Sequence, residues 1–155
     1  SPSSELQTGI IDYKKQSVTV VPALIKMIEE SYQNSIDEWI RTAGKFAKNI
    51  SLSINNTTDG TEITVSDDGR GIPIELIDGK YRPLLAWTEL RAGSNFDDSK
   101  RIGVGTNGMG ISLTNIFSRV FEGKTCNGTD QLTVNCSDNM LNVSHKLSKS
   151  TIPKL

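Results

Sequence analysis

The feature that most constrains this chain is one long amphipathic pattern near its start. Between residues 18 and 43, apolar side chains recur at helical spacing, with Pro22 suited to the first turn and Gly44 suited to the C-terminal stop. The apolar arc contains Leu24, Ile25, Ile28, Tyr32, Ile36, Trp39 and Ile40. The pattern predicts a helix over 18–43 that buries this arc against other elements.

The opposite face of the predicted helix carries Glu30, Asn34, Asp37 and Glu38. Its simplest interpretation is a solvated acidic face. However, no Lys or Arg stands among these four residues, and like charges at helical neighbours cost a few tenths of a kcal/mol each. A divalent cation such as Mg²⁺, which prefers oxygen ligands, or an Arg from another element would relieve that cost.

The remaining pattern predicts short strands and short helices in an irregular order. A length of 155 residues suits one domain, with residues 1–17 as an N-terminal arm or tail and 18–155 as the domain. The irregular alternation favours an α+β fold with helices on one face of a sheet. The predicted elements are a hairpin of strands at 49–54 and 61–65 around a turn at 55–60, helices at 83–90 and 111–117, and β-prone runs within 120–147, including 132–136 and 140–143.

Composition excludes several classes of function. Seventeen Lys and Arg against eighteen Asp and Glu give a net charge of −1, which excludes a domain that grips nucleic acid through bulk positive charge. The cysteines Cys126 and Cys136 form no C-x-x-C motif, and His145 is the only histidine, so neither a zinc site nor a disulfide scaffold is expected. No run approaches a membrane span of about 18 apolar residues, and the start shows no signal-peptide pattern.

A second polar constellation follows the hairpin, in the segment from Asp67 to Pro73. A turn is the simplest interpretation, because Asp and Gly dominate turns. Glycines on both sides of Arg70 also allow the backbone to approach a flat ligand closely. Asp67 at the end of a strand can accept a hydrogen bond from an exocyclic amine, and Arg70 can pair with an acidic residue of the long helix.

A third constellation is the glycine-rich segment 91–110. Gly103, Gly105 and Gly108 fit G-x-G-x-x-G, but no strand precedes them, so a dinucleotide-binding fingerprint is rejected. No G-K-S/T follows either. Backbone N–H groups of such a loop, entering a helix at Ile111, remain well suited to bind phosphate, and Lys100 lies nearby.

Taken in order, these motifs resemble those of the GHKL ATPase superfamily, and within it the ATPase domain of type II DNA topoisomerases, the gyrase B group together with the phage and eukaryotic enzymes. The resemblance covers about residues 18–117. Asn107 stands where gyrases carry His, which is similar to the phage and eukaryotic type. The matching segments are Glu30-x-x-x-Asn34-x-x-Asp37-Glu38, Asp67-Asp-Gly-Arg-Gly-Ile-Pro73, Arg91-Ala-Gly-Ser-Asn-Phe-Asp-Asp98 and Gly105-Thr-Asn-Gly-Met-Gly-Ile-Ser-Leu-Thr-Asn-Ile-Phe-Ser118.

The resemblance implies a Bergerat fold, a two-layer α/β sandwich with a mixed sheet and helices on one face. It implies that Glu30 is the general base for the attacking water, that Asn34 coordinates Mg²⁺, and that Asp67 accepts from the adenine amino group. Arg70 would pair with Glu38 and wall the pocket. The implied nucleotide-binding residues are Asn34, Asp37, Glu38, Asp67, Arg70, Gly71, Ile72, Pro73, Lys100, Gly105, Thr106, Asn107, Gly108, Met109 and Gly110.

The same resemblance sets expectations for partners. ATP and Mg²⁺ would bind directly, and DNA only through the rest of a homodimeric enzyme in the cytoplasm, that of the host for a phage protein. No membrane association is expected. The sequence ends before the family's Gly-Thr-x-Val strand and transducer domain, and Asn95 stands where gyrases have Lys. We therefore expect this chain alone to be a monomer that binds nucleotide but hydrolyses it poorly.

Two alternatives compete with a topoisomerase domain. One is another GHKL ATPase, of the mismatch-repair, chaperone or histidine-kinase type, and the segment 91–98 argues against it. The other is a non-catalytic interaction domain on the same fold. The presence of Glu30 and Asn34 argues against this second alternative, because a domain that only binds partners has no use for them.

Overall fold

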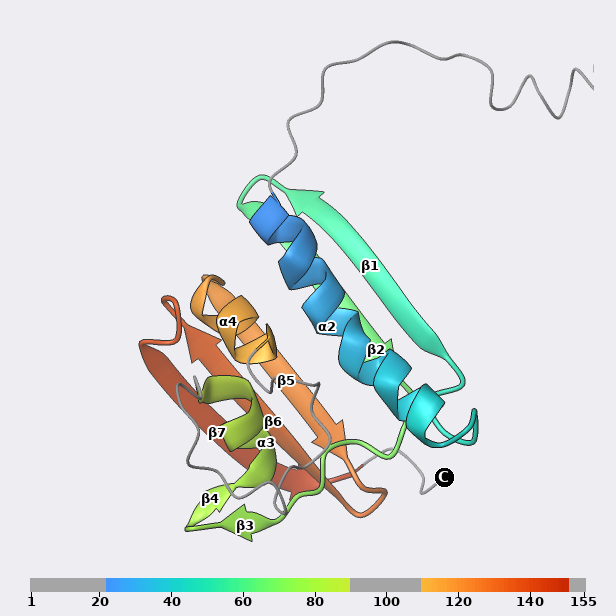
Figure 1. Ribbon diagram of the computed structural model, residues 1–155. Helices are drawn as coiled ribbons and strands as arrows, with labels where there is room; N and C mark the ends of the chain where they lie inside the picture. Colours follow the sequence, from blue (N-terminus) through green and yellow to red (C-terminus); the bar gives the residue numbers. More distant parts are fainter. Residues whose placement is uncertain (1–21, 90–109, 151–155) are drawn as a thin grey trace, which may run out of the picture.

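The computed structural model describes residues 22–89 and 110–150 (Figure 1). It contains three helices and three small antiparallel sheets within those ranges. The elements, in chain order, are α2 (Pro22–Arg41), β1 (Ile50–Thr57), β2 (Gly60–Asp67), β3 (Leu76–Ile77), β4 (Lys80–Tyr81), α3 (Arg82–Thr88), α4 (Gly110–Ile116), β5 (Val120–Cys126), β6 (Asp130–Ser137) and β7 (Asn142–Lys149).

The predicted long helix is confirmed as α2, although residues 18–21 lie outside the described part. Its C-terminal stop is also confirmed. Gly44 adopts a φ of 77°, and its N–H donates to the carbonyl of Trp39 over 2.8 Å. Glycine suits this left-handed position because it lacks a Cβ.

The predicted buried face of α2 is partly wrong. Ile25, Trp39 and Ile40 are exposed, Ile40 to 62%. Two polar residues, Ser35 and Glu38, are buried instead. The reason is that α2 packs against β2 and α4. Ser35 donates to Asp67 at the end of β2, and Glu38 accepts from Arg70 in the loop that follows, which offsets the cost of burying both side chains.

The hairpin of β1 and β2 is confirmed with a tighter turn than predicted. The ladder runs from Ile50 opposite Asp67 to Thr57 opposite Gly60, so only Thr58 and Asp59 form the loop. The Thr57 hydroxyl donates to the carbonyl of Gly60 over 3.0 Å and accepts from the N–H of Asp59 over 3.2 Å. These bonds close the turn within the stretch predicted as six turn residues.

The sheet of β5, β6 and β7 holds the apolar core. Leu132 and Val134 on β6 are fully buried, and Cys136 is nearly so, on the face covered by α3 and α4. Trp87 of α3 packs on β5 at Gly123, where an added Cβ would lie 2.4 Å from the indole ring. The predicted β-prone runs are confirmed, except that β7 begins at Asn142 because Met140 stands in a turn with φ 65°.

Two short helices flank the glycine-rich segment, and both were predicted within two residues of their ends. Pro83 occupies the first turn of α3, as expected for proline. Side chains of α4 bind the last turn of α3. Ser112 donates to the carbonyl of Ala86 over 3.1 Å, and Asn115 to that of Trp87 over 2.8 Å. The small β3–β4 hairpin was not predicted.

The helices lie on one side of the strands, and the contact between α2 and α4 brings the hairpin beside the three-stranded sheet (Figure 1). The α+β class with helices on one face is therefore confirmed. Every strand pair of the described residues is antiparallel, and β2 is not hydrogen-bonded to β5 there. The expected mixed sheet is thus seen in this part as separate antiparallel sheets. No helix among the described residues is long and apolar enough to cross a membrane.

Candidate functional site

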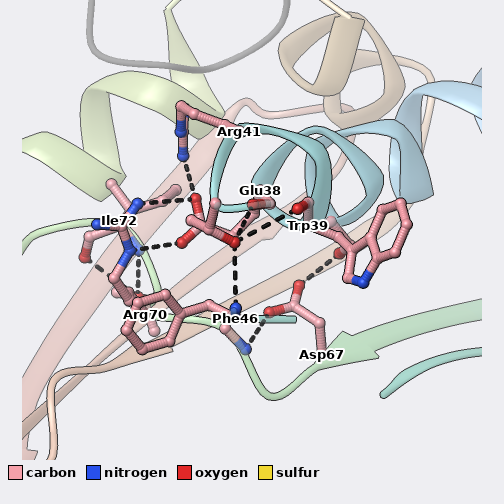
Figure 2. A network of polar contacts seen from close by, with 11 residues as sticks. Glu38, Trp39, Arg41, Phe46, Asp67, Arg70 and Ile72 are labelled. Carbon is pink, nitrogen blue, oxygen red and sulfur yellow. Dashed lines mark hydrogen bonds and ion pairs between the residues drawn. The ribbon is translucent and has the colours of Figure 1, made fainter. Parts of the chain in front are cut away.

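The carboxylate of Asp67 lies where the hairpin meets α2 (Figure 2). Asp67 is the last residue of β2, and its Oδ1 accepts from the N–H of Gly69 over 2.8 Å. Its Oδ2 accepts from the hydroxyl of Ser35, which is buried on α2. The Asp67 side chain itself is exposed. The two bonds fix the orientation of a carboxylate that still faces solvent.

The buried carboxylate of Glu38 is the centre of an ion-pair network (Figure 2). Arg70 donates from Nε to Oε1 over 2.7 Å and from an η nitrogen to Oε2 over 3.3 Å, while Arg41 donates to Oε2. The Arg70 guanidinium also stacks over Phe46, 5.0 Å from the ring centre. Hydrogen bonds from Arg70 in particular hold the pKa of Glu38 below its ordinary value. The expected pairing of Arg70 with Glu38 is present in the structure.

The glycines around Arg70 are required by contacts within the protein. An added Cβ on Gly69 would lie 2.7 Å from Oδ1 of Asp67. On Gly71, which has a φ of +72°, it would lie 2.5 Å from the hydroxyl of Thr125 on β5. That hydroxyl accepts from the N–H of Ile72 over 2.8 Å and donates to its carbonyl over 3.1 Å. Close approach of the loop to β5 is therefore enough to explain Gly71, and Pro73 follows it on the surface.

The carboxylates of Glu30 and Asp37 on α2 have partners on the same helix, which the sequence analysis did not predict. Lys26 pairs with Glu30 over 2.9 Å, and Gln33 donates to Asp37 over 2.8 Å. Both pairs are four residues apart, so the sequence contained the signal. The negative charge is thus relieved at Glu30 by Lys26 and at Glu38 by Arg70, an Arg from another element as expected, whereas Asp37 has a neutral hydrogen-bonding partner.

Asn34 lies between these pairs and is half-buried. No side-chain hydrogen bond of Asn34 is found among the described residues. Its amide oxygen is a suitable Mg²⁺ ligand. The described residues contain no group of three acidic, His or Cys side chains that would hold a metal by themselves. A single amide oxygen suits Mg²⁺, since that ion usually keeps waters and phosphate oxygens as its other ligands.

Asp68, the neighbour of Asp67, was not singled out by the sequence. Its carboxylate accepts from the backbone N–H of Asn49 over 3.0 Å and from the Asn49 side-chain amide over 2.7 Å. These bonds, the backbone one first, lower the pKa of Asp68. Asp68, just beyond the end of β2, thus closes the base of the hairpin through Asn49, while Asp67 accepts from Ser35 on α2.

Most predicted phosphate-binding residues lie outside the described part of the chain. Gly110 is the first residue of α4. The structure therefore brings together the predicted residues on α2 and in the loop 67–73 and leaves the rest as predictions. The predicted residues outside the described ranges are Lys100, Gly105, Thr106, Asn107, Gly108 and Met109.

The family model described as "Histidine kinase-, DNA gyrase B-, and HSP90-like ATPase" matches residues 19–149. The chain belongs to this family. It is 43% identical over 150 residues to the DNA topoisomerase large subunit of Enterobacteria phage T4, a match that covers 93% of this chain and 28% of the phage protein. It is 40% identical over 113 residues to DNA topoisomerase 2 of Candida albicans, covering 71% of this chain and 8% of the yeast protein. The chain thus spans about a quarter of the phage relative.

Solved structures show the same fold. The ATPase region of Saccharomyces cerevisiae topoisomerase II, bound to ICRF-187, superposes with a TM-score of 0.66 at 28% identity over 91% of this chain and 38% of that one. The ATPase and transducer domains of DNA topoisomerase II from Balamuthia mandrillaris give a TM-score of 0.64 at 32% identity, covering 83% of this chain and 33% of that one. The predicted GHKL fold, in its topoisomerase II form, is confirmed.

Proposed function

We propose that this chain binds ATP with Mg²⁺ as the ATPase domain of a type II DNA topoisomerase. The observation that carries the proposal is the Asp67 carboxylate, exposed yet oriented by two donors, at the edge of α2. The face of α2 that bears Glu30 and Asn34 supports it. Membership in an ATPase family and similarity to topoisomerase ATPase regions support the proposed nucleotide and enzyme class.

At the end of the site that would bind the adenine ring, Asp67 accepts a hydrogen bond from the adenine amino group. Its backbone is fixed by the ladder to Ile50, and its carboxylate by Ser35 and Gly69. The pairing of Arg70 with Glu38 holds the adjoining loop against α2, and Thr125 holds that loop against β5. The pocket wall is therefore preorganised before nucleotide binds.

At the phosphate end, Glu30 acts as the general base. Lys26 binds its Oε1, which leaves Oε2 to accept the proton of the attacking water. An exposed pair of this kind is weak, so Lys26 restrains Glu30 without locking it. Asn34 holds the metal, and Mg²⁺ when bound neutralises charge on the phosphates. Positioning and electrostatics carry most of such phosphoryl transfer.

The activity of a whole enzyme is a wider proposal, because the chain spans 28% of its phage relative. In such an enzyme, ATP binding would drive dimerisation of a protein gate, and hydrolysis would reset it for another DNA strand passage. DNA would be contacted through other domains, in the cytoplasm. We propose that this chain alone is monomeric and turns over slowly.

Calorimetric titration with a non-hydrolysable ATP analogue, with and without Mg²⁺, tests the binding proposal. Asp67→Asn should weaken binding about 5- to 150-fold, as expected for the loss of one hydrogen bond that bound adenine would shield from water. Asp68→Asn is the matched control, since it changes the neighbouring carboxylate that closes the hairpin, and its affinity should stay near that of the wild type. No binding by the wild-type chain, or equal losses in both variants, would contradict the proposal.

The catalytic assignment is tested separately by Glu30→Gln. This variant should bind the analogue with Mg²⁺ as the wild type does, while any ATP turnover is lost, because the amide cannot take the proton from water. Phosphate release under saturating ATP measures this. Turnover that survives the substitution would remove Glu30 from its proposed role.

A further inference from the structure

We propose that Ser35 is a positioning residue that sets the base selectivity of the nucleotide site. The inference rests on the proposed function, since it concerns how Asp67 recognises adenine. It concerns one contact of the structure, the hydrogen bond from the Ser35 hydroxyl to Oδ2 of Asp67.

The two residues come from different elements and differ in exposure. Ser35 lies on α2 with 6% of its surface exposed, while Asp67 ends β2 and is exposed. A serine hydroxyl has a single proton to donate. Ser35 donates that proton to Asp67, so the buried hydroxyl orients the exposed carboxylate.

The consequence concerns which acceptor sites of Asp67 remain. A carboxylate has about four lone-pair sites. One on Oδ1 is used by the N–H of Gly69 and one on Oδ2 by Ser35. The plane of the carboxylate is thereby fixed from two sides, and the sites that remain can only accept. A base that offers an amino group satisfies them, whereas a base with a carbonyl oxygen at the same position does not.

Without the Ser35 hydroxyl, Oδ2 loses its donor and the carboxylate is held by Gly69 alone. The carboxylate is then free to turn, and a water molecule can take the place of the hydroxyl. A water can donate or accept, so it can mediate contact with either an amino group or a carbonyl oxygen. Loss of the hydroxyl should therefore reduce discrimination between the two kinds of base more than it reduces binding itself.

Helix α2 offers a matched control in Ser31. Its hydroxyl donates to the carbonyl of Met27 over 2.7 Å, within the helix itself, and does not reach Asp67. Ser31→Ala and Ser35→Ala make the same chemical change one turn apart. A general effect of removing a hydroxyl from α2 would appear in both variants.

The experiment is a calorimetric titration with two non-hydrolysable triphosphates in the presence of Mg²⁺, one carrying adenine and one carrying hypoxanthine, which has a carbonyl oxygen in place of the amino group. The readout is the ratio of the two dissociation constants. We expect the wild type and Ser31→Ala to prefer adenine equally, and Ser35→Ala to lose about fivefold of that preference. In an Asp67→Asn background, Ser35→Ala should change the ratio no further.

A second variant, Ser35→Cys, keeps the side-chain volume with a weak donor and covers the case in which the alanine variant does not fold. Its ratio should lie below that of the wild type. A wild-type ratio in Ser35→Ala or Ser35→Cys, together with a reduced ratio in Asp67→Asn, would overturn the role of Ser35 and leave the proposed function intact. Failure of the wild type to bind either analogue would overturn the proposed function, and the inference with it.

Discussion

The hairpin β1–β2 and the sheet β5–β7 are built from antiparallel strands of seven or eight residues, but they are buried to different extents. Every residue of β1 is exposed, whereas alternate residues of β6 are buried beneath α3 and α4. The polar side chains of the candidate site belong mainly to the hairpin side, where α2 covers β2. The buried apolar cluster on β6 and the polar side chains of the candidate site therefore lie in different halves of the described structure.

The clearest test of this difference compares the same substitution in both halves. Leu132→Ala on β6 removes a side chain with no exposed surface and should cost about 2–5 kcal/mol of unfolding free energy. Leu52→Ala on β1, where the leucine is 45% exposed, should cost about 1 kcal/mol or less. Urea unfolding followed by circular dichroism measures both. Equal losses would show that the hairpin is as well packed in solution as the sheet.

The next largest effect on stability is expected in the loop that joins the two halves. Gly71→Ala should cost about 2–4 kcal/mol, because the new Cβ meets Thr125 on β5 and the backbone has a left-handed φ. Gly79→Ala has a similar φ of +81° but nothing within 4 Å of the Cβ, so about 1–2 kcal/mol is expected there. The difference between the two variants in thermal unfolding isolates the contact with β5. If the two costs are equal, the loop is not held against the sheet.

The ion pairs of Glu38, on the hairpin side, predict that part of the unfolding free energy is lost at acidic pH. Hydrogen bonds from Arg70 lower the pKa of Glu38 from its ordinary value of 4.5. A lowered folded-state pKa stabilises the fold above that ordinary value, and the contribution is lost as the pH falls toward the lowered pKa. Glu38→Gln should therefore cost about 1–2 kcal/mol at pH 7 and less at pH 3.

Urea unfolding of the wild type and Glu38→Gln between pH 7 and pH 3 measures this effect. The two stabilities should converge as the pH falls. Asp68 also has a lowered pKa, so Asp68→Asn serves as a comparison at the base of the same hairpin. A gap between wild type and Glu38→Gln that stays constant with pH would contradict the assignment of the ion pair.

The sequence predicted much of each half, for reasons that differ between them. A β-prone run between turn signals predicted the strand containing Leu132 and Val134, and a turn-rich stretch after the alternating run 49–54 predicted the hairpin. The pairing of Arg70 with Glu38 was also anticipated, from opposite charge and from the family motif. These are local patterns, or patterns that a motif ties together.

Most other features depend on the tertiary arrangement and could not be predicted from the sequence alone. The hydrogen bond from Ser35 to Asp67 joins residues 32 positions apart on different elements, and no sequence spacing predicts it. The side of α2 that is buried depends on where α4 and β2 pack, so the apolar arc alone predicted the wrong exposure for Ile40. The contact of Gly71 with Thr125 joins residues far apart in the sequence, so the sequence offered only the approach to a ligand as a reason for this glycine. The partners of Glu30 and Asp37 were visible at four-residue spacing and were overlooked.

The smallest expected effect concerns the exposed apolar side of α2. Ile40→Gln should change the unfolding free energy by no more than about 0.5 kcal/mol, because the side chain is 62% exposed. Ile28→Gln on the same helix should cost about 1 kcal/mol or more, because Ile28 is half-buried. Urea unfolding at two protein concentrations measures both. If Ile40→Gln costs more than Ile28→Gln, another surface covers this side of α2 in solution. A dependence of that cost on concentration would identify the covering surface as a second copy, and independence would assign it to the chain itself. Either result would bring the hairpin half closer to the sheet in burial and weaken the contrast between them.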